Sequence, residues 1–368
     1  MMYDVIAAYQ AYSKFTKQQD IEFEIETVNT GGDYKLLKQS AQKFLFQPQI
    51  KLILAFIDSY AASQIEPFIN ASGKVLISID PGATIPGTHS PNPHQLSLSL
   101  QAAYGSALST HLALQDAHNN VAYFTSFYDG GYLHGYSTAR VLEKNGGAIK
   151  VNFISPFNAS TVDSNIVKEK INESNASAII LQECAESGAV FLNSCSNGSL
   201  PTDFPIYASP FMLEENWIST HPYYFSNIQG FVPWHANIKS EENKLFVDFM
   251  FNETGKQANV FHISGWEAAM LVYGCASAIN QQITHPIQVL DELSKTTLIS
   301  PRGKLTWMPE QRHFVAPMHH VKLINNNGFY KTELMDRALT KTNTWLEFAN
   351  DVPTGTISRW FNMYLCPT

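Results

Sequence analysis

The feature that most constrains the fold is a repeated alternation of short apolar segments with segments of helical periodicity. Strands alternating with helices indicate parallel sheets covered by helices. Apolar spacing predicts strands at 21–28, 51–57, 75–79, 121–125, 149–154, 178–181, 206–208, 228–232, 303–307 and 320–324. It predicts helices at 3–15, 34–46, 61–70, 100–117, 136–144, 162–173, 187–193, 243–251 and 266–280. The chain is therefore predicted to be an α/β protein.

The alternation runs through two successive series, the second of which begins at Val121. A chain of 368 residues also exceeds what one hydrophobic core usually supports. We therefore predict two successive doubly wound, Rossmann-like lobes, with the changeover near residue 119.

Charge argues against a nucleic-acid partner, and hydropathy argues against a membrane-spanning segment. The formal net charge is −8 and no cluster of Lys and Arg occurs, so a nucleic acid is not expected to bind. The longest apolar runs, such as 51–57, have the length of a strand, so no segment is predicted to cross a bilayer. No signal peptide is visible in the sequence.

The four cysteines lack the paired short spacings of zinc sites. They are interpreted as buried thiols or as one or two disulfides, and Cys184 with Cys195 is the first pair to test; the others are Cys275 and Cys366.

Motifs of enzymes are incomplete. The segment 135–139 partly resembles a nucleophile elbow, but its second glycine is replaced by Ala139 and Ser137 falls inside a predicted helix. A hydrolase using Ser137 is therefore the weakest hypothesis. Phosphate-binding loops, Gly-x-Gly-x-x-Gly and His-Glu-x-x-His do not occur, so no cofactor or metal is predicted and the chain is not expected to be an enzyme.

Four local motifs, taken in order, resemble the branched-chain amino acid and amide binding family of ABC importers, which has the type 1 periplasmic binding fold. They are Leu76–Pro86, Asp129–Gly135, Asn145–Ala148 and Ser300–His313, and the resemblance covers roughly residues 3–330. The resemblance implies that the two lobes are joined by three crossovers, near residues 118, 238 and 300. Lobe I is then expected to comprise 1–118 and 240–299, lobe II to comprise 119–239 and 300–335, and an apolar tail, 336–368, to pack on the lobes. The resemblance implies an extracytoplasmic, periplasmic or extracellular, substrate-binding component of an ABC importer. Such a protein is a monomer that binds an amino acid, an amide or an aromatic acid and meets a membrane permease. A sensor of the same fold that signals to a partner protein is the alternative.

In this family the ligand lies between the lobes, at the carboxyl ends of the strands. The resemblance thus implies ligand contacts from the loops that follow five of the strands, with two further aromatic residues. The candidates are Asp58, Ser59, Tyr60, Gly82, Ala83, Thr84, Tyr132, Gln182, Glu183, Phe211, Trp234 and Trp266.

Ordinary structural roles compete with these assignments. Tyr132 and Trp266 could be core aromatic residues, Thr84 could cap a turn, and Asp58 and Ser59 could cap a helix. Trp234 and the neighbouring His235 could line the cleft or cover the hinge.

Two departures from the family pattern carry consequences. The fifth loop, Ser209–Met212, lacks the carboxylate that would pair with an ammonium group, so an α-amino acid is a poor ligand unless Glu183 or Asp58 substitutes. Phe211, with the two tryptophans, would favour a flat and weakly polar solute. The chain also begins inside the family's first helix, so we expect an upstream segment to supply the first strand of lobe I.

Overall fold

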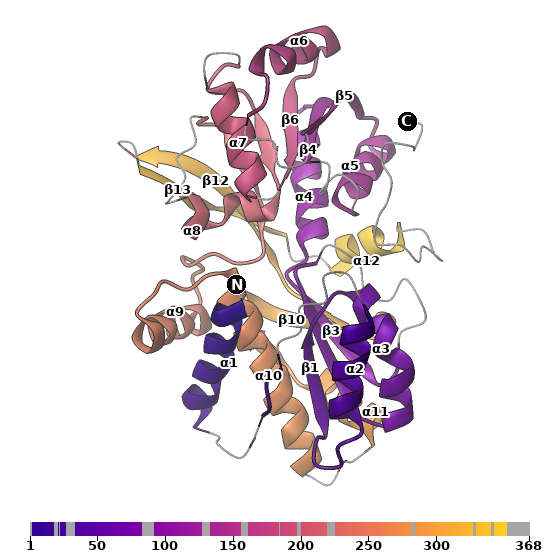
Figure 1. Cartoon of the computed structure of the whole chain (residues 1–368). Helices are drawn as coiled ribbons and strands as arrows, with labels where there is room; N and C mark the ends of the chain where they lie inside the picture. Colours follow the sequence, from indigo (N-terminus) through magenta and orange to yellow (C-terminus); the bar gives the residue numbers. More distant parts are fainter. Residues whose placement is uncertain are drawn as a thin grey trace. The chain divides into compact units, whose positions relative to one another are not determined.

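The structure is a computed structural model that describes residues 2–17, 21, 23–26, 34–82, 92–126, 133–155, 161–183, 185–196, 200–218, 225–280, 283, 285–326, 329–339 and 342–351. The chain divides into two compact units, shown in Figure 1. Unit 1 contains the described residues of Met1–Leu100 and Ile238–Ala316. Unit 2 contains those of Gln101–Asn237 and Pro317–Asp351.

Unit 1 is built on a six-stranded sheet in the order β1-β2-β3-β11-β10-β9. Its strands are β1 (Leu52–Phe56), β2 (Val75–Asp80), β3 (Gln95–Ser99), β9 (Leu298–Ser300), β10 (Gly303–Met308) and β11 (His313–Val315). β1, β2, β3 and β11 are parallel, and β10 is antiparallel to both of its neighbours. The carboxyl ends of β1, β2 and β3 consequently share one edge of the sheet.

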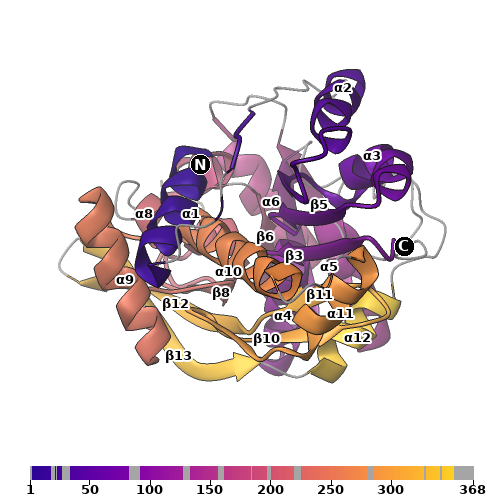
Figure 2. The ribbon, with the colours of Figure 1, turned by 90° about the horizontal axis from the view of Figure 1, so that it is seen from below.

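Helices cover both faces of this sheet. They are α1 (Met2–Thr16), α2 (Tyr34–Leu45), α3 (Ser59–Ser72), α9 (Glu241–Thr254), α10 (Val260–Asn280) and α11 (Pro286–Lys295). Figure 2 shows α2 and α3 on one side of β1–β3 and α10 and α11 on the other. Leu37, Leu45 and Ile65 are buried together with other apolar residues between α2, α3 and the sheet. Burial of this apolar surface stabilises the unit.

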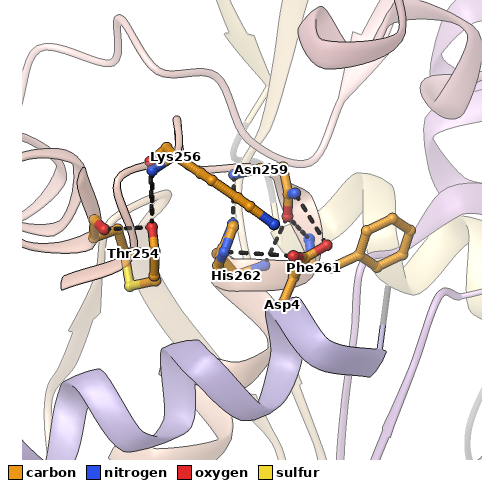
Figure 3. Close-up of polar contacts among 7 residues, drawn as sticks. Asp4, Thr254, Lys256, Asn259, Phe261 and His262 are labelled. Carbon is orange, nitrogen blue, oxygen red and sulfur yellow. Dashed lines mark hydrogen bonds and ion pairs between the residues drawn. The ribbon is translucent and has the colours of Figure 1, made fainter.

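The start of α10 is tied to the start of α1 by a capping side chain (Figure 3). Asn259 Oδ1 accepts hydrogen bonds from the N–H groups of Phe261 and His262, both at 3.0 Å. Asn259 Nδ2 donates to Asp4 Oδ2 at 3.4 Å. These bonds satisfy backbone amides in the first turn of α10 and hold the first turn of α1 beside them.

Unit 2 contains a seven-stranded sheet in the order β13-β12-β8-β7-β6-β4-β5. Its strands are β4 (Asn120–Ser126), β5 (Ala148–Ser155), β6 (Ala178–Gln182), β7 (Ile206–Ala208), β8 (Ile228–Val232), β12 (Met318–Asn326) and β13 (Phe329–Leu339). The five strands from β8 to β5 are parallel, whereas β12 is antiparallel to β8 and to β13.

The helical elements of unit 2 are α4 (Ala102–Gln115), α5 (Leu133–Lys144), α6 (Ser164–Ser174), α7 (Ala185–Cys195), the 3-10 turn η2 (Pro210–Leu213), α8 (Glu215–Ile218) and α12 (Thr342–Asn350). Phe124, Leu181 and Phe191 are buried in a core between the sheet and α6 and α7. On the other face α4 lies against β8, because Gly230 leaves room for Ser109: a Cβ at Gly230 would lie 2.9 Å from Ser109 Oγ. The prediction of an α/β fold with two doubly wound lobes is confirmed by these two sheets.

The two units differ from the predicted lobes in two long segments, and residues 238 and 239 belong to unit 1 instead of lobe II. The segment 101–118 contains α4, which packs on β6, β7 and β8 and so belongs to unit 2. The segment 300–316 contains β10 and β11, and β11 pairs with β3 in unit 1. Of the predicted tail, the described part is the end of β13 and α12, and α12 packs on α4.

One predicted strand was wrong in its described part. The described residues of the predicted strand 21–28, Ile21 and 23–26, are irregular. Phe23 packs its ring against Tyr9 at 5.3 Å, and Glu26 pairs with Lys43, so this segment contacts helices and joins no strand. The structure adds β3, β9, β11, β13, α11 and α12, which were not predicted.

Among the described helices, none is both long and apolar enough to cross a membrane. Cys275 is a free, buried thiol, and burial raises its pKa to about 12. Cys195 is buried, whereas Cys184 and Cys366 lie outside the described residues. The proposed pairing of Cys184 with Cys195 stays a prediction.

Candidate functional site

Three hydroxyl groups converge on Gln182, the last residue of β6 in unit 2, and on Glu183, which follows it. Thr125 Oγ1, from the end of β4, donates to the carbonyl of Gln182 at 2.7 Å. Ser209 Oγ, which follows β7, donates to the carbonyl of Glu183 at 2.7 Å. Ser155 Oγ, from the end of β5, donates to Glu183 Oε1 at 2.9 Å. The peptide of residues 182 and 183 is thus held by the strands on either side of β6.

The strand register explains why these side chains meet. Thr125 is the partner of Gln182 in the pairing of β4 with β6, and Ser155 is the partner of Ser126 in the pairing of β4 with β5. Parallel strands bring their carboxyl ends to one edge, where unpaired backbone groups and loop side chains can meet a ligand. The Glu183 carboxylate reaches from the end of β6 to the end of β5, across the end of β4.

Gln182 and Glu183 are buried, with 1% and 2% of their surfaces exposed. The Gln182 side chain lies against α4, where Ser106 Oγ donates to Oε1 at 2.7 Å. Ser106 is one of several buried hydroxyls of α4, and Ser109 and Thr110 donate to carbonyls one turn earlier. Both residues were predicted to contact ligand, and the structure places them together at the carboxyl edge.

Unit 1 places two carboxyl groups at the equivalent edge of its own sheet. Asp58 follows β1 and caps α3, because its Oδ1 accepts from the N–H of Ala61 at 2.8 Å. Asp80 ends β2 and accepts a hydrogen bond from the N–H of Gly82. Burial raises the pKa of Asp80 to about 8, and the nearby charge of Asp58 adds to this effect. Gly82 has a positive φ of 86°, a conformation that glycine adopts readily.

Three further predicted residues are aromatic: Trp266, Trp234 and Phe211. Trp266 packs among aromatic rings of α1 and α9, with Tyr12 at 5.0 Å and Phe246 at 5.2 Å. Its position accounts for its burial without any ligand. Trp234 follows β8 and is buried, and Phe211 lies half-buried on η2.

The remaining predicted residues are only partly described. Ser59 begins α3, and Tyr60 packs its ring on Tyr34 at 5.4 Å. Ala83, Thr84 and Tyr132 lie outside the described residues.

Four residues at these edges were not singled out from the sequence. They share one signal, since each is a polar residue within one position of the last residue of a strand: Asp80, Thr125, Ser155 and Ser209.

Within the described part of the chain, no three His, Cys, Asp or Glu side chains gather as metal ligands would. Ser137 lies inside α5, and its hydroxyl donates to the Leu133 carbonyl at 2.6 Å. A hydroxyl engaged in its own helix does not form a nucleophile elbow.

Comparison with known proteins decides the family. A family profile described as periplasmic binding protein matches residues 5–328, most of the chain. The chain belongs to this periplasmic binding protein family. The predicted resemblance is therefore confirmed, and the family is one of solute-binding proteins, not enzymes. No curated protein sequence matches the chain.

Solved structures of ABC transporter binding proteins have a similar fold. An ABC transporter substrate-binding protein from Sphaerobacter thermophilus is similar with a TM-score of 0.79 and 15% identity, over 91% of this chain and 92% of that one. A solute-binding protein of an ABC transporter from R. palustris, in complex with 4-hydroxybenzoate, has a TM-score of 0.74 and 15% identity, over 93% and 94% of the chains. A branched-chain amino acid ABC transporter periplasmic ligand-binding protein from Burkholderia xenovorans gives 0.73 and 14%, over 90% of each.

Proposed function

We propose that this periplasmic binding protein is the extracytoplasmic substrate-binding component of an ABC importer, located in the periplasm or outside the cell. One observation carries the proposal beyond the family. Hydroxyls from neighbouring strands fix Gln182 and Glu183 at the carboxyl edge of unit 2, where open α/β sheets bind their ligands.

The proposed solute is a small organic molecule: an amino acid, an amide or an aromatic acid. The R. palustris protein was solved with 4-hydroxybenzoate, which supports a flat organic solute. The loop after β7, Ser209–Met212, contains no carboxylate for an ammonium group. The proposed contacts remain the twelve predicted from the sequence, which are Asp58, Ser59, Tyr60, Gly82, Ala83, Thr84, Tyr132, Gln182, Glu183, Phe211, Trp234 and Trp266.

The proposed partner is the membrane permease of the importer, to which a monomer delivers one solute per chain. Light scattering on the purified chain tests the monomer, and calorimetry tests the stoichiometry. Solute-dependent stimulation of ATP hydrolysis by the importer, reconstituted in vesicles, tests the partnership.

Thermal unfolding in the presence of candidate solutes tests solute binding directly. A ligand that binds only the folded chain at 100 times its Kd stabilises the chain by about 2.7 kcal/mol. We expect at least one solute from a panel of amino acids, amides, urea and aromatic acids to raise Tm in a concentration-dependent way. A panel that leaves Tm unchanged at millimolar concentration contradicts the proposal.

A further inference from the structure

The Glu183 carboxylate is a positioned acid at the edge of unit 2. Only 2% of the residue is exposed, and Ser155 orients Oε1 while Ser209 holds the peptide carbonyl. A hydroxyl that donates to one carboxylate oxygen restricts the rotation of the whole group. The geometry of this acid is therefore set before any solute arrives, as a recognition group requires.

The segments that follow the parallel strands of unit 2 contain His221 and His235 but no Lys or Arg that could balance an anionic solute. These segments are 127–132, 156–163, 183–187, 209–227 and 233–237. A solute carboxylate placed here would add a second negative charge in a poorly solvated position, which is unfavourable. A solute N–H group would instead form a charge-assisted hydrogen bond.

We propose that Glu183 is the specificity-determining residue of unit 2, and that it selects solutes whose polar head presents N–H donors over solutes whose head is a carboxylate. Amides, amidines and protonated amines share this chemistry. The inference rests on the proposed solute-binding function and narrows it, since it separates this chain from the protein solved with 4-hydroxybenzoate.

Ser155 has a positioning role in this scheme. Its hydroxyl touches Glu183, at 2.9 Å, and we assign it no contact with solute. Ser155→Ala removes the restraint on the carboxylate and should weaken binding of N–H heads, whereas Ser155→Thr keeps a hydroxyl and should restore it. A role confined to stability would lower Tm in Ser155→Ala without changing the preference between heads.

Benzoate, benzamide and benzamidine form a matched set for the test, because they share one ring and differ in head charge and donors. Calorimetry on the whole chain should show benzamide and benzamidine binding at least about tenfold tighter than benzoate, the worth of one charged hydrogen bond. Glu183→Gln should reduce that ratio about tenfold, since the amide can donate to benzoate. Glu186→Gln is the matched control, an exposed acid of α7 in which the ratio should not change.

The two proposals fail in different ways. If benzoate binds the wild-type chain most tightly, or if Glu183→Gln leaves the ratio unchanged, the inference is wrong while the solute-binding function stands. Binding of isobutyrate and isobutyramide to the wild-type chain repeats the comparison of a carboxylate head with an amide head without the aromatic ring. If none of these compounds, and no member of the wider panel, binds, both the inference and the proposed function are rejected.

Discussion

Arg302 and Glu267 form a bidentate ion pair in the interior of unit 1. Arg302 Nε donates to Glu267 Oε1 at 2.7 Å and Nη2 donates to Oε2 at 2.8 Å, with side-chain exposures of 0% and 1%. Arg302 Nη2 also donates to the carbonyl of Ser99 at 2.9 Å, which ties the segment after β9 to β3. A pair this deeply buried adds little to the net stability of the fold, but removing one partner leaves an uncompensated buried charge and lowers stability strongly.

Replacing Glu267 by Gln should therefore destabilise the chain strongly. Gln keeps the shape but removes the carboxylate that neutralises Arg302, and breaking a buried pair in this way costs about 3 kcal/mol. The free energy of unfolding in urea measures the loss. Glu292→Gln is the control, because Glu292 pairs with Lys295 on the surface and its removal should leave stability unchanged. Equal effects in the two variants would contradict the argument.

At the scale of elements, α1 and α10 approach closely because α10 has a glycine where they meet. A Cβ at Gly265 would lie 2.0 Å from the carbonyl oxygen of Val5, which belongs to the backbone of α1 and cannot rotate away. At Gly274 in the same helix, a Cβ would lie 2.5 Å from the end of the Leu293 side chain, which can rotate. The two glycines thus separate backbone contact from side-chain contact.

Gly265→Ala should lower the free energy of unfolding by about 1–3 kcal/mol, the usual cost of overpacking. Gly274→Ala should have a smaller effect or none, because alanine also favours helix by about 1 kcal/mol over glycine. Urea denaturation of both variants provides the comparison. A Gly274→Ala variant less stable than Gly265→Ala would show that the contact with α1 does not govern this helix pair.

The same scale shows which elements local sequence could predict. β7 and β8 were predicted at their observed residues, since β7 is a short apolar run and β8 begins and ends with apolar residues. β3 was missed because its polar residues Ser97 and Ser99 interrupt the apolar pattern, although both are buried. The Ser97 hydroxyl can be buried because it donates to the carbonyl of Arg312, 215 residues away. β13 was missed because its inward positions include Thr332, which blurs the alternation of apolar side chains. Contacts between residues far apart in the sequence therefore determine these two strands.

For the molecule as a whole, the sequence predicted two α/β units and the edge of unit 2 that holds Gln182 and Glu183. It did not predict which hydroxyls meet there, because that depends on the register of β4 and β5 and on the position of Ser209. It also missed the buried acid Asp80, whose protonation depends on burial and not on local sequence. Both the meeting of these hydroxyls and the burial of Asp80 result from packing between segments that are distant in the sequence.

Two buried groups of unit 1 couple the stability of the chain to pH in opposite directions. Burial raises the pKa of Asp80 to about 8, so the folded chain holds a proton that the unfolded chain releases above about 4. Stability from Asp80 is therefore full below that pH and is lost as pH rises to about 8. Burial and the nearby Arg302 lower the pKa of His313 to about 3, so its contribution is full above about 6.5 and is lost as pH falls.

Between pH 4 and 6.5 the slopes of these two groups cancel, and between 6.5 and 8 Asp80 is the one of the two that titrates. Over that window we expect its contribution to the unfolding free energy to fall by about 1.4 kcal/mol per pH unit. Asp80→Asn removes this slope, because the amide is neutral at all these pH values and its oxygen can still accept from Gly82. Urea denaturation at pH 6.5 and 8 should thus show a stability difference that favours Asp80→Asn and grows with pH. Parallel curves for the two proteins would mean that Asp80 is ionised throughout, and its burial would then need a positive partner in the folded chain.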